Sequence, residues 1–366
     1  MLNLKSINRY IIKEYLKSLL VVIAVMLSII ILINLLDEFN FFKSKKDLKF
    51  IFFILFTILK IPNVLVNLFP FIVLFGGIVF YLKIYNHNEV ISLRVAGYSN
   101  IQIILIPALT SFVLGYLIVF FIVPFSSSFL KYYEELRSNY NETKNLVFLN
   151  ETGIWILDKG EKDKNIIRIE KINKEFTKIE KITIYNYNNN NDFIRRIDAE
   201  EGVINNKIWE LNKVYIITAN KKNNKENYLK NFNYETKLNI NELKNVYKNT
   251  ETVSLFDISR EILLLENKGY SSVDLRIRYQ KLISFPIYLL AMSILAGLMI
   301  VNLGKTSNYL KYGIYGVIIS IIIYFLNDLS ITIAKSGIIS VDFSVWIPIF
   351  LIILINLVGI TQVNAK

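Results

Sequence analysis

Six apolar runs constrain the fold of this chain more than any other feature of its sequence. Crossing the hydrocarbon core of a bilayer takes about 20 mainly apolar residues in a helix. The composition agrees, because 53% of the 366 residues are hydrophobic, which is high for a soluble fold. The sequence therefore predicts an α-helical membrane protein with six transmembrane helices, at residues 19–36, within 51–85, and at 101–125, 282–303, 309–333 and 343–363.

The segment between about residues 131 and 270 differs, since it holds most of the Asn, Lys and Glu. Within it, TGIWILDKG, NIIRIEKI and KIWELNKVYIITAN alternate apolar and polar residues, which is typical of half-buried antiparallel strands. The flanking stretches SFLKYYEELRSNY and LFDISREILLLENKGY have a helical pattern. We therefore expect a β-jellyroll or β-sandwich domain with helical connectors, inserted between spans three and four.

This layout divides the chain into spans one to three (1–130), the β domain (131–270) and spans four to six (271–366), with a short helix near 88–97 in the first region. Lys and Arg near span ends favour the cytoplasm. With the N-terminus inside, nine such residues lie on the inner side and five on the outer side. We expect both termini in the cytoplasm and the β domain outside. The inner set is Lys5, Arg9, Lys13, Lys17, Lys83, Arg94, Lys305, Lys311 and Lys366, and the outer set is Lys43, Lys45, Lys46, Lys49 and Lys335.

The residues that catalysis commonly needs are scarce. The chain has no Cys and a single histidine, His87, which excludes disulfides, thiolate metal sites and His clusters. LGKT at 303–306 resembles the end of a phosphate-binding loop, but Met299 stands where that motif requires its first Gly. We therefore expect no catalytic residue, no metal site and no cofactor. The net charge of +12 is scattered and accompanies no nucleic-acid motif, so we expect no nucleic-acid partner.

The stretch NEVISLRVAGYSN, residues 88–100, is charged and lies between two apolar runs. Asn88 can cap a short helix and Gly97 can close it in a left-handed conformation. The helix has more apolar positions than a solvated connector needs, so we expect a protein surface to cover part of it. The alternative is an interfacial helix that lies on the lipid headgroups. A membrane protein that has such a helix but no nucleotide-binding motif of its own suggests a transporter subunit that is driven by a separate ATPase subunit.

Polar residues inside the apolar runs are further candidates, because they are costly in lipid and usually face a bundle interior or a wet cavity. Asp328 comes one turn after Tyr324, and it either lines a polar cavity or makes a helix–helix hydrogen bond. Lys60 lies near an interface, where its long side chain can reach water. The whole set is Asn34, Lys60, Asn67, Asn327 and Asp328.

Three stretches spread over nearly the whole chain carry a family resemblance: INRYIIKEYLKSLL at 7–20, LFPFIVLFGGIVFYLKIYNHNEVISLRVAGYS at 68–99 and RYQKLISFPIYLLAMSILAG at 278–297. They resemble the lipopolysaccharide-export permease family, LptF/LptG (YjgP/YjgQ type). TGIWILDKG followed by NIIRIEKI resembles the opening of the external domain of the LptG branch. The resemblance implies a bacterial inner-membrane location and a periplasmic β-jellyroll. It also implies a paralogous permease (LptF), a cytoplasmic ATPase dimer of the LptB type that binds ATP, and a periplasmic bridge of the LptC/LptA type.

The resemblance also implies roles for individual residues. The helix at 88–97 would be the coupling helix that enters a groove of the ATPase, the outer parts of spans one and five would line a cavity for the lipid, and inward residues of the β domain would line a groove for acyl chains. The coupling residues are Glu89, Leu93, Arg94, Ala96 and Gly97. The cavity residues are Asn34, Asp37, Lys43, Lys45, Lys46, Tyr324 and Asp328, and the groove residues are Ile154, Ile156, Ile182 and Ile184.

This sequence departs from the family pattern at one place. Family members use basic residues against the phosphates of the lipid head, whereas here Asn34 is followed by Asp37 and Glu38. Two other functions stay open. The chain could be the transmembrane subunit of another envelope ABC transporter, or a membrane scaffold with a periplasmic β domain that transports nothing and contacts no ATPase.

Overall fold

The computed structural model describes residues 4–43, 50–138, 146–150, 153–159, 163–173, 177–188, 192–205, 208–218, 225–236, 249–267, 271–301 and 309–364. The chain divides into two compact units. The helical unit contains residues 1–135, 251–256 and 276–366, and the β unit contains residues 136–250 and 257–275. The β unit is therefore an insertion, which the chain enters through one helix and leaves through another.

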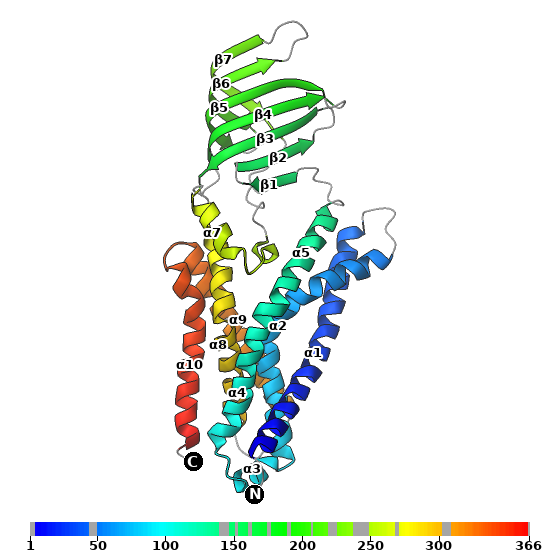
Figure 1. The fold of residues 1–366 in the computed structure, drawn as a ribbon, viewed down its shortest axis with the longest axis vertical. Helices are drawn as coiled ribbons and strands as arrows, with labels where there is room; N and C mark the ends of the chain where they lie inside the picture. The colour runs from blue at the N-terminus through cyan, green and yellow to red at the C-terminus, as the bar shows by residue number, and fades with distance from the viewer. Residues whose placement is uncertain are drawn as a thin grey trace. The chain divides into compact units, whose positions relative to one another are not determined.

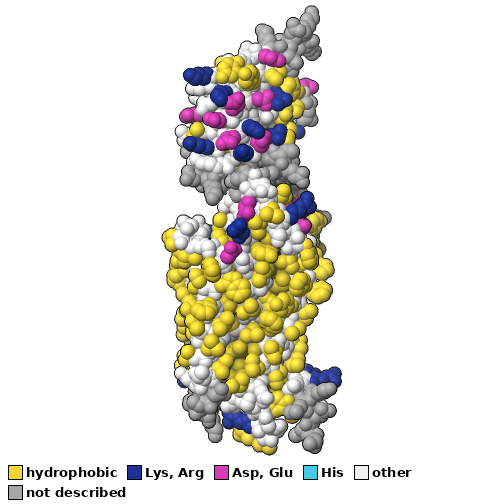
Figure 2. All heavy atoms as spheres, turned by 60° about the vertical axis from the view of Figure 1, so that its left-hand side comes forward, with side chains coloured by type: hydrophobic (Ala, Val, Ile, Leu, Met, Phe, Trp, Pro, Cys, Tyr) yellow, Lys and Arg dark blue, Asp and Glu magenta, His cyan; other side chains and the backbone are white. Residues whose placement is uncertain are grey.

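Six helices in the described part of the chain are long and apolar enough to cross a membrane, which confirms the six predicted spans. Figure 2 shows their apolar side chains as a broad belt on the helical unit. The third span is not one regular helix, because α4 continues through a π-helical turn, η1, into α5. The elements are α1 (Leu4–Phe42), α2 (Phe50–Asn86), α3 (Glu89–Val95), α4 (Asn100–Leu117), η1 (Ile118–Ile122), α5 (Val123–Ser138), η3 (Thr250–Thr252), α7 (Ile258–Asn267), α8 (Val273–Val301), α9 (Tyr309–Lys335) and α10 (Val341–Asn364).

The second span passes through two prolines without ending. Both Pro62 and Pro70 lie inside α2, although proline removes a helical hydrogen bond. Membrane helices tolerate this residue because neighbouring groups satisfy the freed carbonyls. Figure 1 shows α3 and both chain termini at the same end of the helical unit.

The core of the helical unit combines close packing with buried polar contacts, one of which joins three spans. The Tyr15 hydroxyl on α1 lies 2.5 Å from Oγ of Ser111 on α4 and donates to Oγ of Ser293 on α8 (3.3 Å). Where α4 meets α8, a Cβ atom on Gly115 would lie 2.6 Å from Cα of Pro286, so only glycine fits there. Three spans are thus fixed against one another in the interior.

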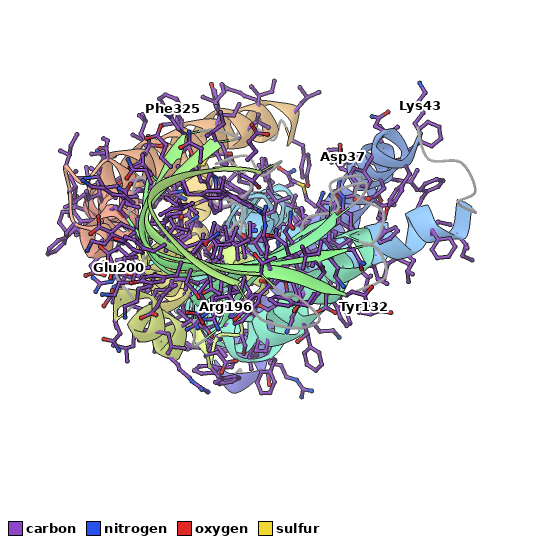
Figure 3. The ribbon with its side chains drawn as sticks, turned by 90° about the horizontal axis from the view of Figure 1, so that it is seen from above. Asp37, Lys43, Tyr132, Arg196, Glu200 and Phe325 are labelled. Atoms are coloured by element: carbon purple, nitrogen blue, oxygen red, sulfur yellow. The ribbon has the colours of Figure 1, made fainter. Side chains whose placement is uncertain are left out.

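The β unit contains one antiparallel sheet in which consecutive strands are neighbours, in the order β1 to β7. The inserted antiparallel domain is confirmed, but the described strands do not form the two facing sheets of a sandwich. Figure 3 shows instead that the single sheet bends into an arc, so one sheet covers its own apolar face. The strands are β1 (Leu146–Asn150), β2 (Gly153–Lys159), β3 (Asp163–Ile172), β4 (Lys178–Asn188), β5 (Phe193–Asn205), β6 (Ile208–Thr218) and β7 (Lys225–Glu235).

A line of charged residues marks where this sheet bends. Glu170, Lys181, Glu200 and Lys213 come from four consecutive strands, and the ladder pairs skip each of them. Lys181 and Lys213 have positive φ angles of 51° and 52°, and residues other than glycine rarely adopt such backbone angles. Such irregularities increase the bend and twist of a sheet, and Figure 3 places Glu200 on the outer face of the arc. Two ion pairs join neighbouring members of this line, Lys181–Glu170 at 2.9 Å and Lys213–Glu200 at 2.5 Å.

Candidate functional site

The short helix α3 is the first candidate site, and its two ends are built differently. At the C-terminal end, the amide of Tyr98 donates to the Leu93 carbonyl (3.0 Å) and the amide of Gly97 donates to the Arg94 carbonyl (2.9 Å). This pair of bonds is a Schellman motif, which needs a left-handed residue. Gly97 supplies it with a φ of 92°, as the sequence predicts. The prediction that the Asn88 side chain caps the other end is wrong, because Asn88 is itself left-handed and its side chain makes no cap hydrogen bond.

Two tyrosine hydroxyls tie α3 to the first span. Tyr10 on α1 donates a hydrogen bond to Oε2 of Glu89 (3.0 Å). Tyr98, just after α3, donates one to Oδ1 of Asn8 on α1 (2.5 Å). The sequence interpretation assigned Glu89 to a partner surface, and in the structure its carboxylate already holds a neighbouring helix.

A buried carboxylate on α1 joins the same end of the unit to the second span. Glu14 is 6% exposed and accepts hydrogen bonds from Lys83 of α2 (2.6 Å) and from Lys17 one turn along α1 (2.5 Å). Hydrogen bonds between charged groups are roughly twice as strong as neutral ones. With the tyrosine contacts, they make α1, α2 and α3 one connected block at this end.

The two faces of α3 have different environments. Val90 and Leu93 are buried against the unit, so Leu93 stabilises the helix and is not available to a partner. Ile91 and Val95 are 57% and 85% exposed and lie one turn apart, and Arg94 is exposed beside them, donating to Oδ1 of Asn100 (2.9 Å). Of the other predicted residues, Ala96 is half-buried and Gly97 is exposed.

This exposed face could have been found from the sequence. Residues four apart lie on the same side of a helix, and the spacing of Ile91 and Val95 meets that rule. The coupling residues predicted from the family resemblance include neither of them.

The C-terminal part of α1 is the second candidate site, and its polar residues face in two directions. Asn34 is buried, and its Nδ2 has no hydrogen-bond partner among the described residues. Asp37 is exposed and pairs with Lys60 of α2 at 3.9 Å. Lys43 is exposed and points away from the bundle in Figure 3. The other two predicted lysines, Lys45 and Lys46, lie outside the described residues.

Glu38, which follows Asp37 directly in the sequence, was not among the predicted cavity residues. Its side chain is completely buried and accepts a hydrogen bond from the Tyr133 hydroxyl of α5 (2.5 Å). A tertiary partner 95 residues away decides its environment, and the local sequence holds no signal for it.

Span five is the third candidate site. Tyr324 is 64% exposed on α9, and Asp328 is exposed one turn further along. Phe325 also points outward from this helix (Figure 3). No hydrogen bond or ion pair between described residues joins Tyr324 or Asp328 to Asn34 or Asp37.

The predicted groove residues of the β domain lie together. Ile154, Ile156, Ile182 and Ile184 are all at most 1% exposed and line the inner face of the arc. Arg196, by contrast, lies on the outer face of the arc in Figure 3. The inner face is an apolar interior that is filled in this conformation.

A polar cluster surrounds Arg278 near the start of α8, and of its members the sequence analysis named only Asn67. Arg278 is 8% exposed, its Nη2 donates to Oγ of Ser127 (2.8 Å), and its Nη1 has no hydrogen-bond partner among the described residues. Close to it, the Asn63 and Asn67 side chains of α2 both donate to the Glu251 carboxylate. An arginine at the start of an apolar run was the available signal.

Metal-binding side chains do not gather in the described ranges. No group of three or more His, Cys, Asp or Glu residues there could hold a metal ion. The candidate sites offer an exposed apolar pair on α3, two spans that are lightly buried within the chain, and an apolar interior of the β unit.

Comparison with known proteins connects these sites. No curated protein sequence matches the chain. The model of one protein family, Lipopolysaccharide export system permease LptF/LptG, matches residues 9–362 and so includes all six spans, α3 and the β unit. The match does not separate LptF from LptG. Because it extends over nearly the whole sequence, the chain belongs to the LptF/LptG family of lipopolysaccharide export permeases.

Proposed function

We propose that this chain is one of two permease subunits that extract lipopolysaccharide from the inner membrane and pass it to a periplasmic bridge. A separate cytoplasmic ATPase dimer of the LptB type hydrolyses the ATP, and this chain binds no cofactor of its own. The observation that carries the proposal is α3, which exposes Ile91 and Val95 while Tyr10 holds it on α1.

Docking of the ATPase on α3 follows from what that helix exposes. An apolar pair with an adjacent arginine is a suitable anchor for a protein groove, since buried aliphatic contacts and Arg dominate many interfaces. Val95 and Ile91 supply the apolar contacts and Arg94 the charge. Both termini lie at the same end of the helical unit as α3 (Figure 1), which supports a cytoplasmic location for all three.

Movement of the ATPase reaches the lipid through the connected block of α1, α2 and α3. A push on α3 acts on α1 through the Tyr10–Glu89 and Tyr98–Asn8 hydrogen bonds, so the spans move as rigid bodies. The far end of α1 carries Asn34, Asp37 and Lys43, which form this chain's side of the lipid cavity. Its displacement changes the shape of that cavity.

The second wall of the cavity comes from the partner permease, of the LptF type. α1 and α9 are the natural contact elements, because only 22% and 17% of their most apolar windows are buried within the chain. Tyr324 and Asp328 on α9 are costly to leave in lipid. A paralogous subunit with its own α1 and α9 would cover these two side chains.

The isoleucine-lined interior of the β unit is the proposed site for the acyl chains of the lipid. It receives them only if the curved sheet opens.

The test is co-purification of the full chain with the ATPase and measurement of ATP-driven lipid release. Val95→Glu places a charge on the docking face, so the ATPase is lost although the permease pair remains intact. Tyr10→Phe removes one hydroxyl behind that face, so the ATPase is retained but release per ATP hydrolysed falls severalfold.

Two outcomes would contradict the proposal. Retention of a fully coupled ATPase by Val95→Glu would show that α3 is not the docking element. Absence of any ATPase with the wild-type chain, under conditions that keep the permease pair together, would favour a membrane scaffold over a transporter.

A further inference from the structure

A groove between α8 and α10 has no part in the function proposed above. It has a volume of about 710 Å³, which is within the usual range of about 300–1,000 Å³ for ligand-binding pockets. Aliphatic and aromatic side chains form most of its walls. The main lining residues are Ile287 of α8 and Phe343, Trp346, Ile347, Phe350 and Ile353 of α10.

Hydrogen bonds hold the two helices together at both ends of this groove. At one end, Gln280 of α8 donates to Oδ1 of Asp342 (2.8 Å), and the Trp346 indole N–H donates to Oε1 of Gln280 (3.2 Å). At the other end, the buried Asn356 of α10 donates to the backbone carbonyl of Ala291 (2.8 Å). Between these contacts the helices leave the slot open.

The length of the slot matches one leaflet of a bilayer. The lining residues of α10 run from Asp342 to Ile353, 11 positions that correspond to roughly 16 Å of helix at 1.5 Å per residue. Half of the hydrocarbon core is about 15 Å thick. Both walls belong to candidate spans, so the medium beside the slot is acyl chains and not water.

The polar end of the slot resembles a membrane–water boundary. Tryptophan is enriched there because its ring is apolar while its N–H needs a partner, and Trp346 has that partner in Gln280. Asp342 is exposed at the mouth and carries a negative charge. That charge attracts an ammonium group and repels a headgroup that carries only phosphate.

From these contacts, we propose that the groove binds a phospholipid with an ammonium-bearing headgroup, with one acyl chain in the slot and the headgroup at Asp342. The lipid belongs to the leaflet at the end of the unit away from α3. It completes the packing of α10 against α8, and it is distinct from the exported cargo, whose phosphates the Asp342 carboxylate disfavours.

The chain carries its own probe for this lipid. Of its three tryptophans, Trp155 and Trp209 belong to strands of the β unit and only Trp346 lies in a span. Brominated acyl chains quench a tryptophan that they touch. The experiment reconstitutes the full chain in vesicles with brominated phosphatidylethanolamine or with brominated phosphatidylglycerol, using Trp346→Phe to define the background.

The proposal predicts that brominated phosphatidylethanolamine quenches Trp346 at about threefold lower mole fraction than brominated phosphatidylglycerol, as expected for one partly exposed ion pair. Asp342→Asn removes this preference, whereas Asp274→Asn, a matched change at an exposed position near the start of α8, keeps it. Ile287→Phe fills the slot and reduces quenching by both lipids.

Two results would overturn the proposal. Equal quenching by both lipids, or a preference for phosphatidylglycerol, rules out the ammonium headgroup. Quenching that Ile287→Phe leaves unchanged means that no acyl chain occupies the slot, and that a helix of another protein is the better candidate. Neither result depends on ATPase docking, so the lipid site and the export function are tested separately.

Discussion

Spans four and five show how little hydropathy says about a helix's surroundings. The most apolar windows of α8 and α9 have the same mean hydropathy, 2.1, yet 72% of the first window and 17% of the second are buried within the chain. Both sequences are equally suited to a bilayer. One of them forms the centre of the helical unit and the other remains on its surface.

The difference arises from small and polar residues and not from apolar content. In α8, Ser293 takes part in the buried contact with Tyr15, and Gly297 lies close against Tyr81. Small residues and side-chain hydrogen bonds are the usual means of association between membrane helices, because lipid provides no hydrophobic drive between them. On α9 the exposed positions are large, and Tyr324 and Asp328 among them require a cover that this chain does not supply.

The largest expected effect comes from adding the same side chain at the two surfaces. Gly115→Leu pushes a side chain into the backbone of Pro286 on α8 and should lower the free energy of unfolding by about 3 kcal/mol, the upper end of overpacking costs. Gly313→Leu on α9 meets nothing within 4 Å and should change it by less than about 0.5 kcal/mol. Unfolding of the purified chain in detergent, followed by circular dichroism, compares the two, and equal losses would refute the contrast.

The second test concerns a buried charge on α8. Ser127→Ala removes the hydrogen-bond acceptor of Arg278 and leaves the buried guanidinium without that partner. This should lower the free energy of unfolding by about 2 kcal/mol. In an Arg278→Met background, Ser127→Ala should leave the free energy of unfolding almost unchanged. Lys311→Met on α9 removes only an exposed contact with Tyr315, worth about 0.5–1 kcal/mol. A serine effect that is the same in both backgrounds would mean that the two side chains do not interact.

The exposed face of α9 should matter for association and not for the stability of the single chain. Tyr324→Ala combined with Phe325→Ala should leave the unfolding midpoint unchanged but weaken binding of the partner permease about tenfold, as expected for aromatic interface residues. Co-purification titrations measure the binding. Leu357→Ala, at a similarly exposed site on α10, is the control, and an equal loss there would show that the effect is not specific to α9.

The parts of the fold that follow from local chemistry could be predicted from the sequence. Apolar length alone identifies the spans, and alternation places Ile154 and Ile182 on an inward face. Gly97 closes α3 because glycine tolerates a positive φ. None of these conclusions needs a distant partner.

What could not be predicted depends on contacts between distant residues. The bend that converts an expected sandwich into one curved sheet passes through Lys181 and Lys213, whose positive φ angles no residue preference indicates. Glu38 is buried because Tyr133 lies next to it. The division of α3 into a buried and an exposed face depends on its neighbours, which bury Leu93 and leave Val95 exposed.

The smallest effect is expected where water, and not lipid, surrounds an exposed contact. On the bend of the sheet, the hydrogen bond from Lys181 lowers the pKa of Glu170. A lowered folded-state pKa stabilises the fold above the unfolded value of about 4.3, and this stabilisation is lost as the pH falls through the folded-state pKa.

Because both groups are substantially exposed, the contribution should be below about 1 kcal/mol and should weaken with salt. Glu170→Gln should therefore lower the stability of the β unit slightly at pH 7 and by less at pH 3, as measured on the full chain by the fluorescence of Trp155 and Trp209 during denaturation. A loss of the same size at both pH values would mean that Glu170 acts through the geometry of the bend. The exposure of a side chain would then not indicate whether the sheet tolerates its substitution.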